Sequence, residues 1–192
     1  DGYVIGAING GTVRLSFRNA PQGAHVDLAS KTVVNDGWGF TETISGSGRV
    51  TEVEMTMNND TVVGSSFDDR FILMAGIETL DGGDGYDSLR YDRTGVESVS
   101  LVNGVATGIW LGAAFTHTIS NIEEIFGSTD FGDNLSGDAG ANRFLGGGGN
   151  DTLVGLAGDD RLYGEAGNDS LDGGDGRDRL IAGSGDDVLD SS

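Results

Sequence analysis

Large apolar residues recur every nine residues along two stretches of the chain. Residues 119–190 divide into eight blocks of nine, whose eighth position holds Phe126, Leu135, Phe144, Leu153, Leu162, Leu171, Leu180 and Leu189. The same frame fits residues 46–90, where the eighth position holds Val53, Val62, Phe71, Leu80 and Leu89. A fixed period of this kind indicates an array of small structural units stacked on one another.

Each block predicts one turn followed by one short strand. The five clearest blocks begin at Gly146, and their first six residues are mostly glycine and aspartate. These six residues are expected to form a turn, because glycine is entropically costly in a helix or strand and aspartate competes for backbone hydrogen bonds. The last three residues, such as Thr152, Leu153 and Val154, are long enough for one strand crossing, in which only the middle side chain points inward.

If turn and strand alternate, two consecutive blocks complete one coil, and the predicted fold is an all-β parallel β-roll or β-helix solenoid. Blocks two apart then lie on the same side at about 4.8 Å, the spacing of paired strands. One column contains Asp151, Asp169 and Asp187, and another contains Asp160 and Asp178. Carboxylates stacked at this distance repel one another unless a cation lies between them. Calcium accepts irregular cages of carboxylates and carbonyls, so it fits better than magnesium.

The blocks from Gly146 follow the pattern G-G-x-G-x-D-x-U-x, where U is a large apolar residue, and they resemble the RTX (hemolysin-type) calcium-binding nonapeptide repeat. The resemblance implies several Ca²⁺ ions between stacked turns, held by the sixth-position aspartate and by carbonyls of the glycine-rich positions. Carried over to the matching blocks, the implied metal-binding residues are Asp69, Gly82, Gly83, Asp84, Gly85, Asp87, Asp133, Gly146, Gly147, Gly148, Gly149, Asp151, Gly155, Ala157, Gly158, Asp160, Gly164, Ala166, Gly167, Asp169, Gly173, Gly174, Asp175, Gly176, Asp178, Gly183, Gly185 and Asp187. The resemblance also implies a non-catalytic structural module that folds on calcium after type I secretion, as part of a larger extracellular protein.

Two blocks of the C-terminal run depart from the pattern. Asn142 stands where aspartate is expected and keeps one oxygen ligand without the charge, so its site should be weaker. Phe131 takes a glycine position in block 128–136, although Asp133 can still pair with Asp151. A row of solvated acidic turns without metal is the alternative interpretation of the whole array.

In the first run only block 82–90 matches fully. Its Asp87 lies two blocks after Asp69, the spacing of stacked turns, so one calcium ion is expected between these two turns. A weaker cation site is expected between Asp60 and Glu78, which have the same spacing but whose turns have little glycine.

The composition excludes several classes of protein. The 192 residues include 11 Lys and Arg against 31 Asp and Glu, a net charge of −20, which argues against a nucleic-acid partner. Cysteine is absent, so no disulfide framework or thiolate metal site is expected. No apolar run is long enough for a transmembrane segment, and the start at Asp1 resembles neither an initiator methionine nor a signal peptide. We therefore expect a piece of a longer chain, with the parent's other domains as partners.

The chain is predicted to form one continuous solenoid with four segments. Residues 1–45 read as short capping strands or irregular coils, residues 46–90 as a degenerate repeat run, residues 91–118 as an irregular coil and residues 119–190 as the main array. Two related segments of sequence follow Trp38 and Trp110, so the layout of irregular coils leading into metal-binding coils occurs twice.

Catalytic motifs are missing from the sequence. It contains no H-E-x-x-H, no G-x-S-x-G and no phosphate-binding G-x-x-x-x-G-K-[ST] motif. His25 and His117 lie among apolar neighbours and are expected to be structural. A glycosidase-like carboxylate pair stays an alternative, but calcium already explains the period of the acidic residues.

A row of arginines suggests a second binding function. Arg143, Arg161 and Arg179 recur at every second block, and an apolar row containing Tyr163 runs beside them. The arginines on this face could hold an anionic polysaccharide through bidentate bonds to carboxylates, as the resemblance to the R-modules of mannuronan C5-epimerases allows. The simpler interpretation, which we favour, is that they pair with neighbouring aspartates and keep the sheet face soluble.

Overall fold

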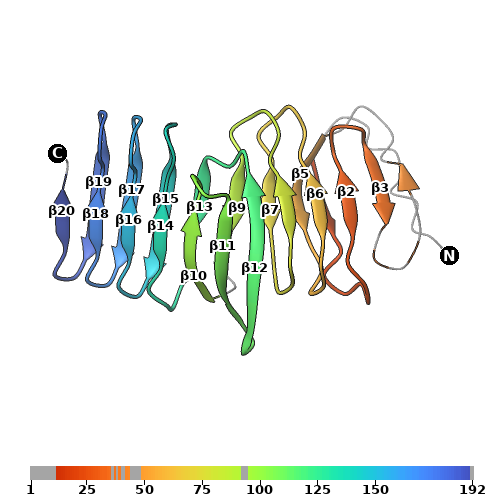
Figure 1. The fold of residues 1–192 in the computed structure, drawn as a ribbon, viewed down its shortest axis with the longest axis horizontal. Helices are drawn as coiled ribbons and strands as arrows, with labels where there is room; N and C mark the ends of the chain where they lie inside the picture. The colour runs from red at the N-terminus through yellow and green to blue at the C-terminus, as the bar shows by residue number, and fades with distance from the viewer. Residues whose placement is uncertain are drawn as a thin grey trace. The chain divides into compact units, whose positions relative to one another are not determined.

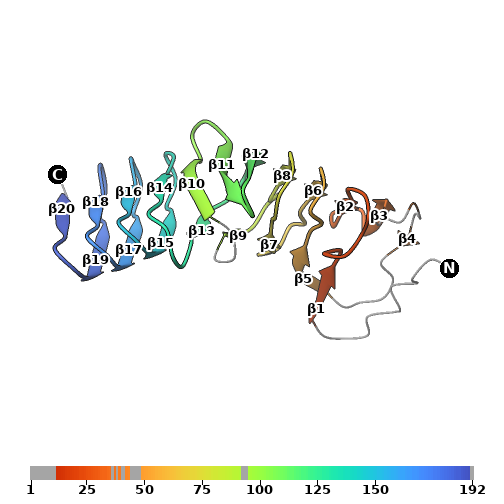
Figure 2. The ribbon, with the colours of Figure 1, turned by 90° about the horizontal axis from the view of Figure 1, so that it is seen from below.

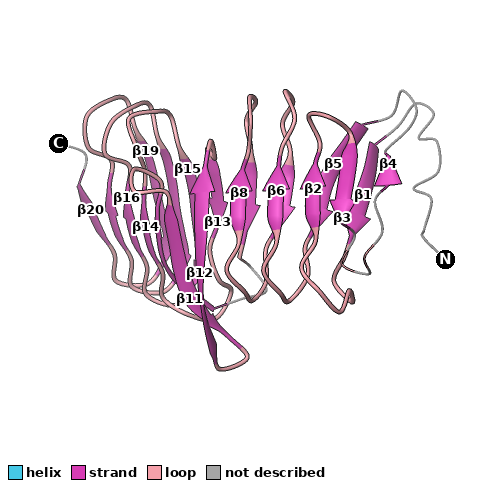
Figure 3. Ribbon diagram, turned by 45° about the vertical axis from the view of Figure 1, so that its right-hand side comes forward, coloured by secondary structure: helices cyan, strands magenta, loops and turns pink. Residues whose placement is uncertain are grey.

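The computed structural model describes residues 12–35, 37, 39, 42–43, 49–91 and 95–190. Within these residues the chain forms strands and turns and no helix, as Figures 1 and 3 show. Most neighbouring strands in the repeat runs are parallel, so the prediction of an all-β parallel roll is confirmed. Trp38 and much of the expected capping segment lie outside the described residues.

The chain divides into two compact units, and the first comprises Asp1–Leu89 with His117–Ile122. Its sheets have the strand orders β1-β5-β7-β9 and β4-β3-β2-β6-β8, with the end of β12 beside β8. The strands are β1 (Thr12–Ser16), β2 (His25–Asp27), β3 (Thr32–Asn35), β4 (Glu42–Thr43), β5 (Arg49–Glu54), β6 (Thr61–Val63), β7 (Arg70–Ile72), β8 (Thr79–Asp81), β9 (Ser88–Arg90), which ends at the boundary, and β12 (Ala113–Ser120), which both units share.

The second unit comprises Arg90–Thr116 and Glu123–Ser192. One layer has the order β13-β15-β17-β19, and the other runs from β11 through β10 to β14-β16-β18-β20. The two layers of this unit are visible in Figure 2. The strands are β10 (Gly95–Ser100), β11 (Val105–Trp110), β13 (Glu124–Phe126), β14 (Asn134–Ser136), β15 (Arg143–Gly148), β16 (Thr152–Val154), β17 (Arg161–Ala166), β18 (Ser170–Asp172), β19 (Arg179–Ser184) and β20 (Val188–Asp190).

Two blocks form one coil, as the spacing predicts. Leu153 pairs in register with Leu135 on one side and with Leu171 on the other, each two blocks away. All three side chains are at most 1% exposed, so they form the narrow core between the two layers. Leu189 is 50% exposed because it lies in the last coil, over which no strand of the described chain packs.

The turn-only interpretation of the first six block positions was wrong for alternate blocks. The strands β15, β17 and β19 are six residues long and continue into the glycine-rich positions. Identical positions in the next coil supply the parallel hydrogen-bonding ladder, with Gly147 beside Glu165 and Gly148 beside Ala166. Stacking of equivalent backbones thus overrides the low strand propensity of glycine.

The nine-residue frame is one residue out in block 119–127. Ile125, not Phe126, aligns with Phe144 and is 0% exposed. The separation is therefore one residue longer than two blocks, and the following turn absorbs the extra residue. That turn contains Phe131, which is 62% exposed.

The irregular segment 91–118 contains antiparallel strands. β10 pairs with β11 in antiparallel register, and Gly104 in the intervening turn has φ +65°. A second tight turn at Leu111 and Gly112, with φ +49° and +83°, leads from β11 to β12. These reversals explain why the nine-residue period stops here.

Candidate metal centre

Four sixth-position side chains of the second unit form a column within the stacked turns. The backbone N–H of Asp133 donates to Oδ1 of Asp151 at 2.8 Å, and the N–H of Asp151 donates to Oδ1 of Asp169 at 2.8 Å. The N–H of Asp169 donates in turn to Oδ1 of Asp187 at 2.9 Å. One carboxylate oxygen of each later residue therefore joins two coils.

The opposite turns contain a second column. Asn142 donates its backbone N–H to Oδ1 of Asp160 at 2.7 Å, and Asp160 donates to Oδ1 of Asp178 at 2.9 Å. The two-block spacing in the sequence therefore places all these side chains next to one another as expected.

The first unit contains two shorter pairs with the same geometry. The N–H of Asp69 donates to Oδ1 of Asp87 at 2.7 Å, and the N–H of Asp60 donates to Oε2 of Glu78 at 2.6 Å. All four side chains are at most 2% exposed.

The second carboxylate oxygen distinguishes the glycine-rich turns. Oδ2 of Asp151, Asp160 and Asp169 is buried and accepts no hydrogen bond in the described part of the chain. The three residues are only 1–2% exposed. A buried carboxylate oxygen without a partner is costly, so these atoms are candidate ligands for a cation.

Glycine at the first turn position leaves space beside this oxygen. A Cβ at Gly146 would lie 2.1 Å from Oδ2 of Asp151, and a Cβ at Gly164 would lie 2.3 Å from Oδ2 of Asp169. Any larger residue would fill the space that faces the orphaned oxygen.

The second turn position adopts a left-handed backbone even where it is not glycine. Leu156 has φ +77° and Glu165 has φ +76°, similar to Gly174 at +80°. Such a conformation costs a non-glycine residue roughly 1–2 kcal/mol. The turn geometry is therefore imposed by its place in the stack, and the residue types at these two positions do not indicate it.

Four turns have a different arrangement at this position. The residue at the second position donates its backbone N–H to the sixth-position side chain, and its φ is not positive. The residue pairs, donor first, are Thr56 and Asp60, Ser65 and Asp69, Ser128 and Asp133, and Asp138 and Asn142.

Burial raises the pKa of several of these carboxyl groups. It raises that of Asp133 to about 7 and that of Asp151 to about 6, and the neighbouring carboxylates add to the effect. The pKa of Asp160 is also raised by burial. Burial, together with the charge of Asp60, raises the pKa of Glu78 to about 9, so Glu78 is protonated at neutral pH.

The donor set fits a hard cation bound through oxygen. In the described residues no group of three or more Asp, Glu, His or Cys side chains gathers around one point. Each glycine-rich turn instead contributes one carboxylate, so backbone carbonyls have to supply further ligands. Calcium tolerates such a mixed cage, whereas magnesium requires a near-ideal octahedron.

The remaining predicted residues lie in the same turns. These are the residues whose backbone carbonyls are the expected ligands. In turn 82–87 they are Gly82, Gly83, Asp84 and Gly85. In turns 146–151, 155–160, 164–169, 173–178 and 182–187 they are Gly146, Gly147, Gly148, Gly149, Gly155, Ala157, Gly158, Gly164, Ala166, Gly167, Gly173, Gly174, Asp175, Gly176, Gly183 and Gly185. Ala157 and Asp175 form a parallel bridge between neighbouring coils.

His117 lies outside these turns. It is fully buried in the first unit, where burial lowers its pKa to about 4.

Comparison with known families bears on the identity of these turns. Residues 56–89, 128–162 and 154–189, together half of the chain, match the RTX calcium-binding nonapeptide repeat. The chain belongs to this family. RTX repeats bind calcium and serve as structural modules, so the turns with orphaned carboxylate oxygens lie in a calcium-binding array. No curated protein matches the chain.

The RTX assignment agrees with the repeats predicted from the sequence. The matched segments include both the run before residue 90 and the array after residue 128. Because the described residues contain no helix, they contain no helix that could span a membrane.

The raised pKa values predict that acid stabilises the calcium-free RTX fold. The unfolded groups titrate near pH 4, whereas Asp151, Asp133 and Glu78 in the fold titrate at about 6, 7 and 9. Their protons therefore favour the fold below about pH 4, and this stability is lost as the pH rises through the folded values. In EDTA, far-UV circular dichroism should therefore show more β-structure at about pH 5 than at about pH 9. More β-structure at the alkaline pH would contradict the burial of these groups.

Proposed function

We propose that this chain is a structural module whose glycine-rich turns fold when they bind calcium, after secretion as part of a larger extracellular protein. The observation that carries the proposal is the set of buried oxygens without partners, Oδ2 of Asp151, Asp160 and Asp169. The repeated geometry extends the ligand assignment to Asp87, Asp178 and Asp187, with carbonyls of the same turns.

Calcium would supply the positive charge that the folded turns lack. An ionised carboxylate buried without a partner opposes folding. An ion that binds the folded state and not the unfolded chain stabilises the fold in proportion to the logarithm of its concentration. Folding and calcium binding are then one equilibrium.

The higher calcium concentration outside the cell would make this folding occur only after secretion. Extracellular calcium modules typically have dissociation constants of about 10⁻⁴ to 10⁻³ M, well above cytosolic calcium. RTX repeats occur in secreted proteins. The glycine-rich coils would thus stay unfolded in the producing cell and fold outside, while any catalysis would belong to other domains of the parent.

Removing ligands should weaken this folding switch. We expect the wild-type chain to gain β-structure as calcium is added to EDTA-treated protein, with magnesium ineffective. The double variant Asp151→Asn, Asp169→Asn should need about tenfold more calcium, because two charged ligands are lost. Far-UV circular dichroism during the titration measures the midpoint.

The control is Asp130→Asn, which removes one carboxylate charge from an exposed position in the same unit. Its midpoint should stay that of the wild type. Equal midpoints for the control and the double variant, or a wild-type chain that is fully β-structured in EDTA and indifferent to calcium, would contradict the proposal.

A second candidate function is binding of an anionic polysaccharide, as in a secreted epimerase or adhesin. Arg143, Arg161 and Arg179 lie in register on β15, β17 and β19. Arg143 is engaged by an ion pair with Glu124 and lies 5.1 Å from the ring centre of Tyr163.

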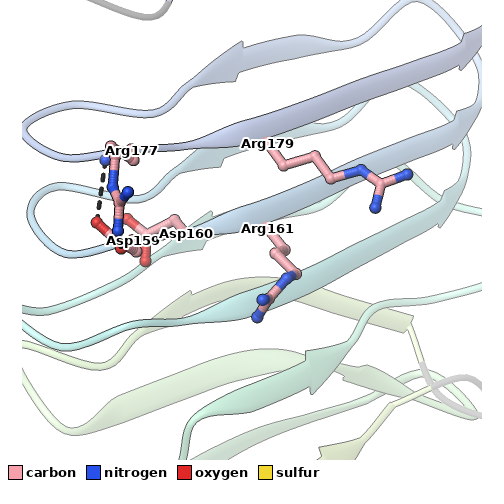
Figure 4. A pocket seen from close by; sticks show the side chains of 5 residues that line it. All are labelled: Asp159, Asp160, Arg161, Arg177 and Arg179. Carbon is pink, nitrogen blue, oxygen red and sulfur yellow. Dashed lines mark hydrogen bonds and ion pairs between the residues drawn. The ribbon is translucent and has the colours of Figure 1, made fainter.

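Arg161 and Arg179 are the available part of this face. Both are exposed and form no ion pair in the described chain, and Arg177 pairs with Asp159 at 3.2 Å beside them. Together with Asp160 they line a shallow hollow of about 340 Å³ (Figure 4). This surface favours a carboxylate-bearing polymer over a neutral one.

Arg161→Ala with Arg179→Ala should abolish retention on immobilised alginate in calcium, because the two guanidinium groups are the proposed carboxylate ligands. Arg177→Ala is the control, since that side chain is already paired with Asp159. Retention that is equal in both variants would leave the arginines with a structural role only.

A further inference from the structure

Apart from turn 73–78, the turns covered by the family match are of two chemical kinds. Turns 55–60, 64–69, 127–133 and 137–142 each have the second-position N–H bonded to the sixth-position side chain, and we call them the self-closed turns. The glycine-rich turns 82–87, 146–151, 155–160, 164–169, 173–178 and 182–187 do not form this bond and have a second residue with positive φ.

Hydroxyl groups reinforce three of the self-closed turns. Thr56 donates its N–H to Oδ2 of Asp60 at 2.9 Å and its hydroxyl to Oδ1 at 2.8 Å. Oδ1 of Asp60 also accepts the N–H of Ala24 at 2.6 Å. Both oxygens of this carboxylate therefore face hydrogens supplied by the protein.

In the other two hydroxyl turns the second-position N–H donates to Oδ2 of the aspartate. Ser65 donates its N–H and its hydroxyl to Oδ2 of Asp69, both at 2.7 Å. The N–H of Ser128 donates to Oδ2 of Asp133 at 2.6 Å, and the Ser128 hydroxyl donates to the carbonyl oxygen of Phe131 in the same turn at 2.7 Å. In the glycine-rich turns the corresponding Oδ2 atoms of Asp151 and Asp169 accept nothing.

The orientation of one peptide group separates the two kinds. In the glycine-rich turns 82–87 and 173–178 the second-position N–H points to a different acceptor. Gly83 donates to Oδ1 of Asp81 at 3.2 Å, and Gly174 donates to Oδ1 of Asp172 at 3.1 Å. The left-handed φ thus turns the N–H away from the sixth-position carboxylate and leaves that carboxylate open to a cation.

Asn142 shows that a self-closed turn does not need a charge at the sixth position. Its Oδ1 accepts the N–H of Asp138 at 3.0 Å, and its residue exposure is 3%. A neutral amide does there what the carboxylates do in turns 55–60, 64–69 and 127–133. A cation approaching Oδ2 of Asp60, Asp69 or Asp133, or Oδ1 of Asn142, would meet the positive end of an N–H dipole.

We propose that the self-closed turns bind no calcium, and that the calcium sites of this array are confined to the glycine-rich turns. The consecutive pairs 55–60 with 64–69 and 127–133 with 137–142 then form coils that fold without the ion. This inference rests on the proposed calcium-binding function and divides the sixth-position residues between structural and ligand roles.

Counting bound ions tests the division. Native mass spectrometry in calcium should find the same number of ions in Asp69→Asn, Asp133→Asn as in the wild type, because both changes copy the natural Asn142. The matched double variant Asp151→Asn, Asp169→Asn should bind fewer ions. Loss of ions from the first variant, while the wild type binds calcium, would overturn this inference and leave the proposed function intact. A wild-type chain without any bound ion would overturn both.

Hydrogen exchange of the wild-type chain provides a test that needs no variant. In EDTA the amides of β6 and β7, beside two self-closed turns, should stay protected, whereas those of β16 and β18 should lose protection and regain it with calcium. Equal loss of protection in all four strands would contradict the inference.

Discussion

Burial of the sixth-position side chain, which is acidic in most turns, is the constraint on which this structure depends. The sixth-position carboxylate joins two coils through one oxygen, as Asp151 does by accepting the N–H of Asp133. The other oxygen is enclosed by the same turn and has to be satisfied there. A protein donor satisfies it in some turns, and in the others the geometry leaves a place for a cation.

The rest of the coil follows from this requirement. In turn 155–160 the first position has to be glycine, because a Cβ at Gly155 would lie 2.2 Å from Oδ2 of Asp160 and 2.5 Å from the carbonyl oxygen of Gly173. The strand that follows contributes one buried side chain, such as Leu162 at 0% exposure. With so small a core per coil, apolar burial alone stabilises each coil only modestly, and the turn chemistry decides whether the coil is ordered.

The nine-residue period predicted the parallel coils, the inward leucines and the columns of aspartates, because each of these depends only on spacing. It failed where one residue is inserted, since a turn can absorb Phe131 without disturbing the pairing of Ile125 with Phe144. Spacing also could not show that Arg143 pairs with Glu124, because the two belong to neighbouring coils and their separation does not match the period.

The backbone conformation at the second turn position could not be predicted from the sequence either. Leu156 and Glu165 adopt positive φ although neither residue favours it, and only the stacked backbone reveals this. Ser65 and Ser128 did leave a signal, a hydroxyl residue where the repeat has glycine, but its meaning required the hydrogen bonds to Asp69 and Asp133.

Crystallography of the calcium-loaded chain, with anomalous scattering to identify the ions, would locate the ligands of each bound ion. We predict calcium bound to Oδ2 of Asp151, Asp160 and Asp169, the atoms that are buried without a hydrogen-bond partner. A folded chain in saturating calcium whose three carboxylates contact only water or protein donors would contradict it.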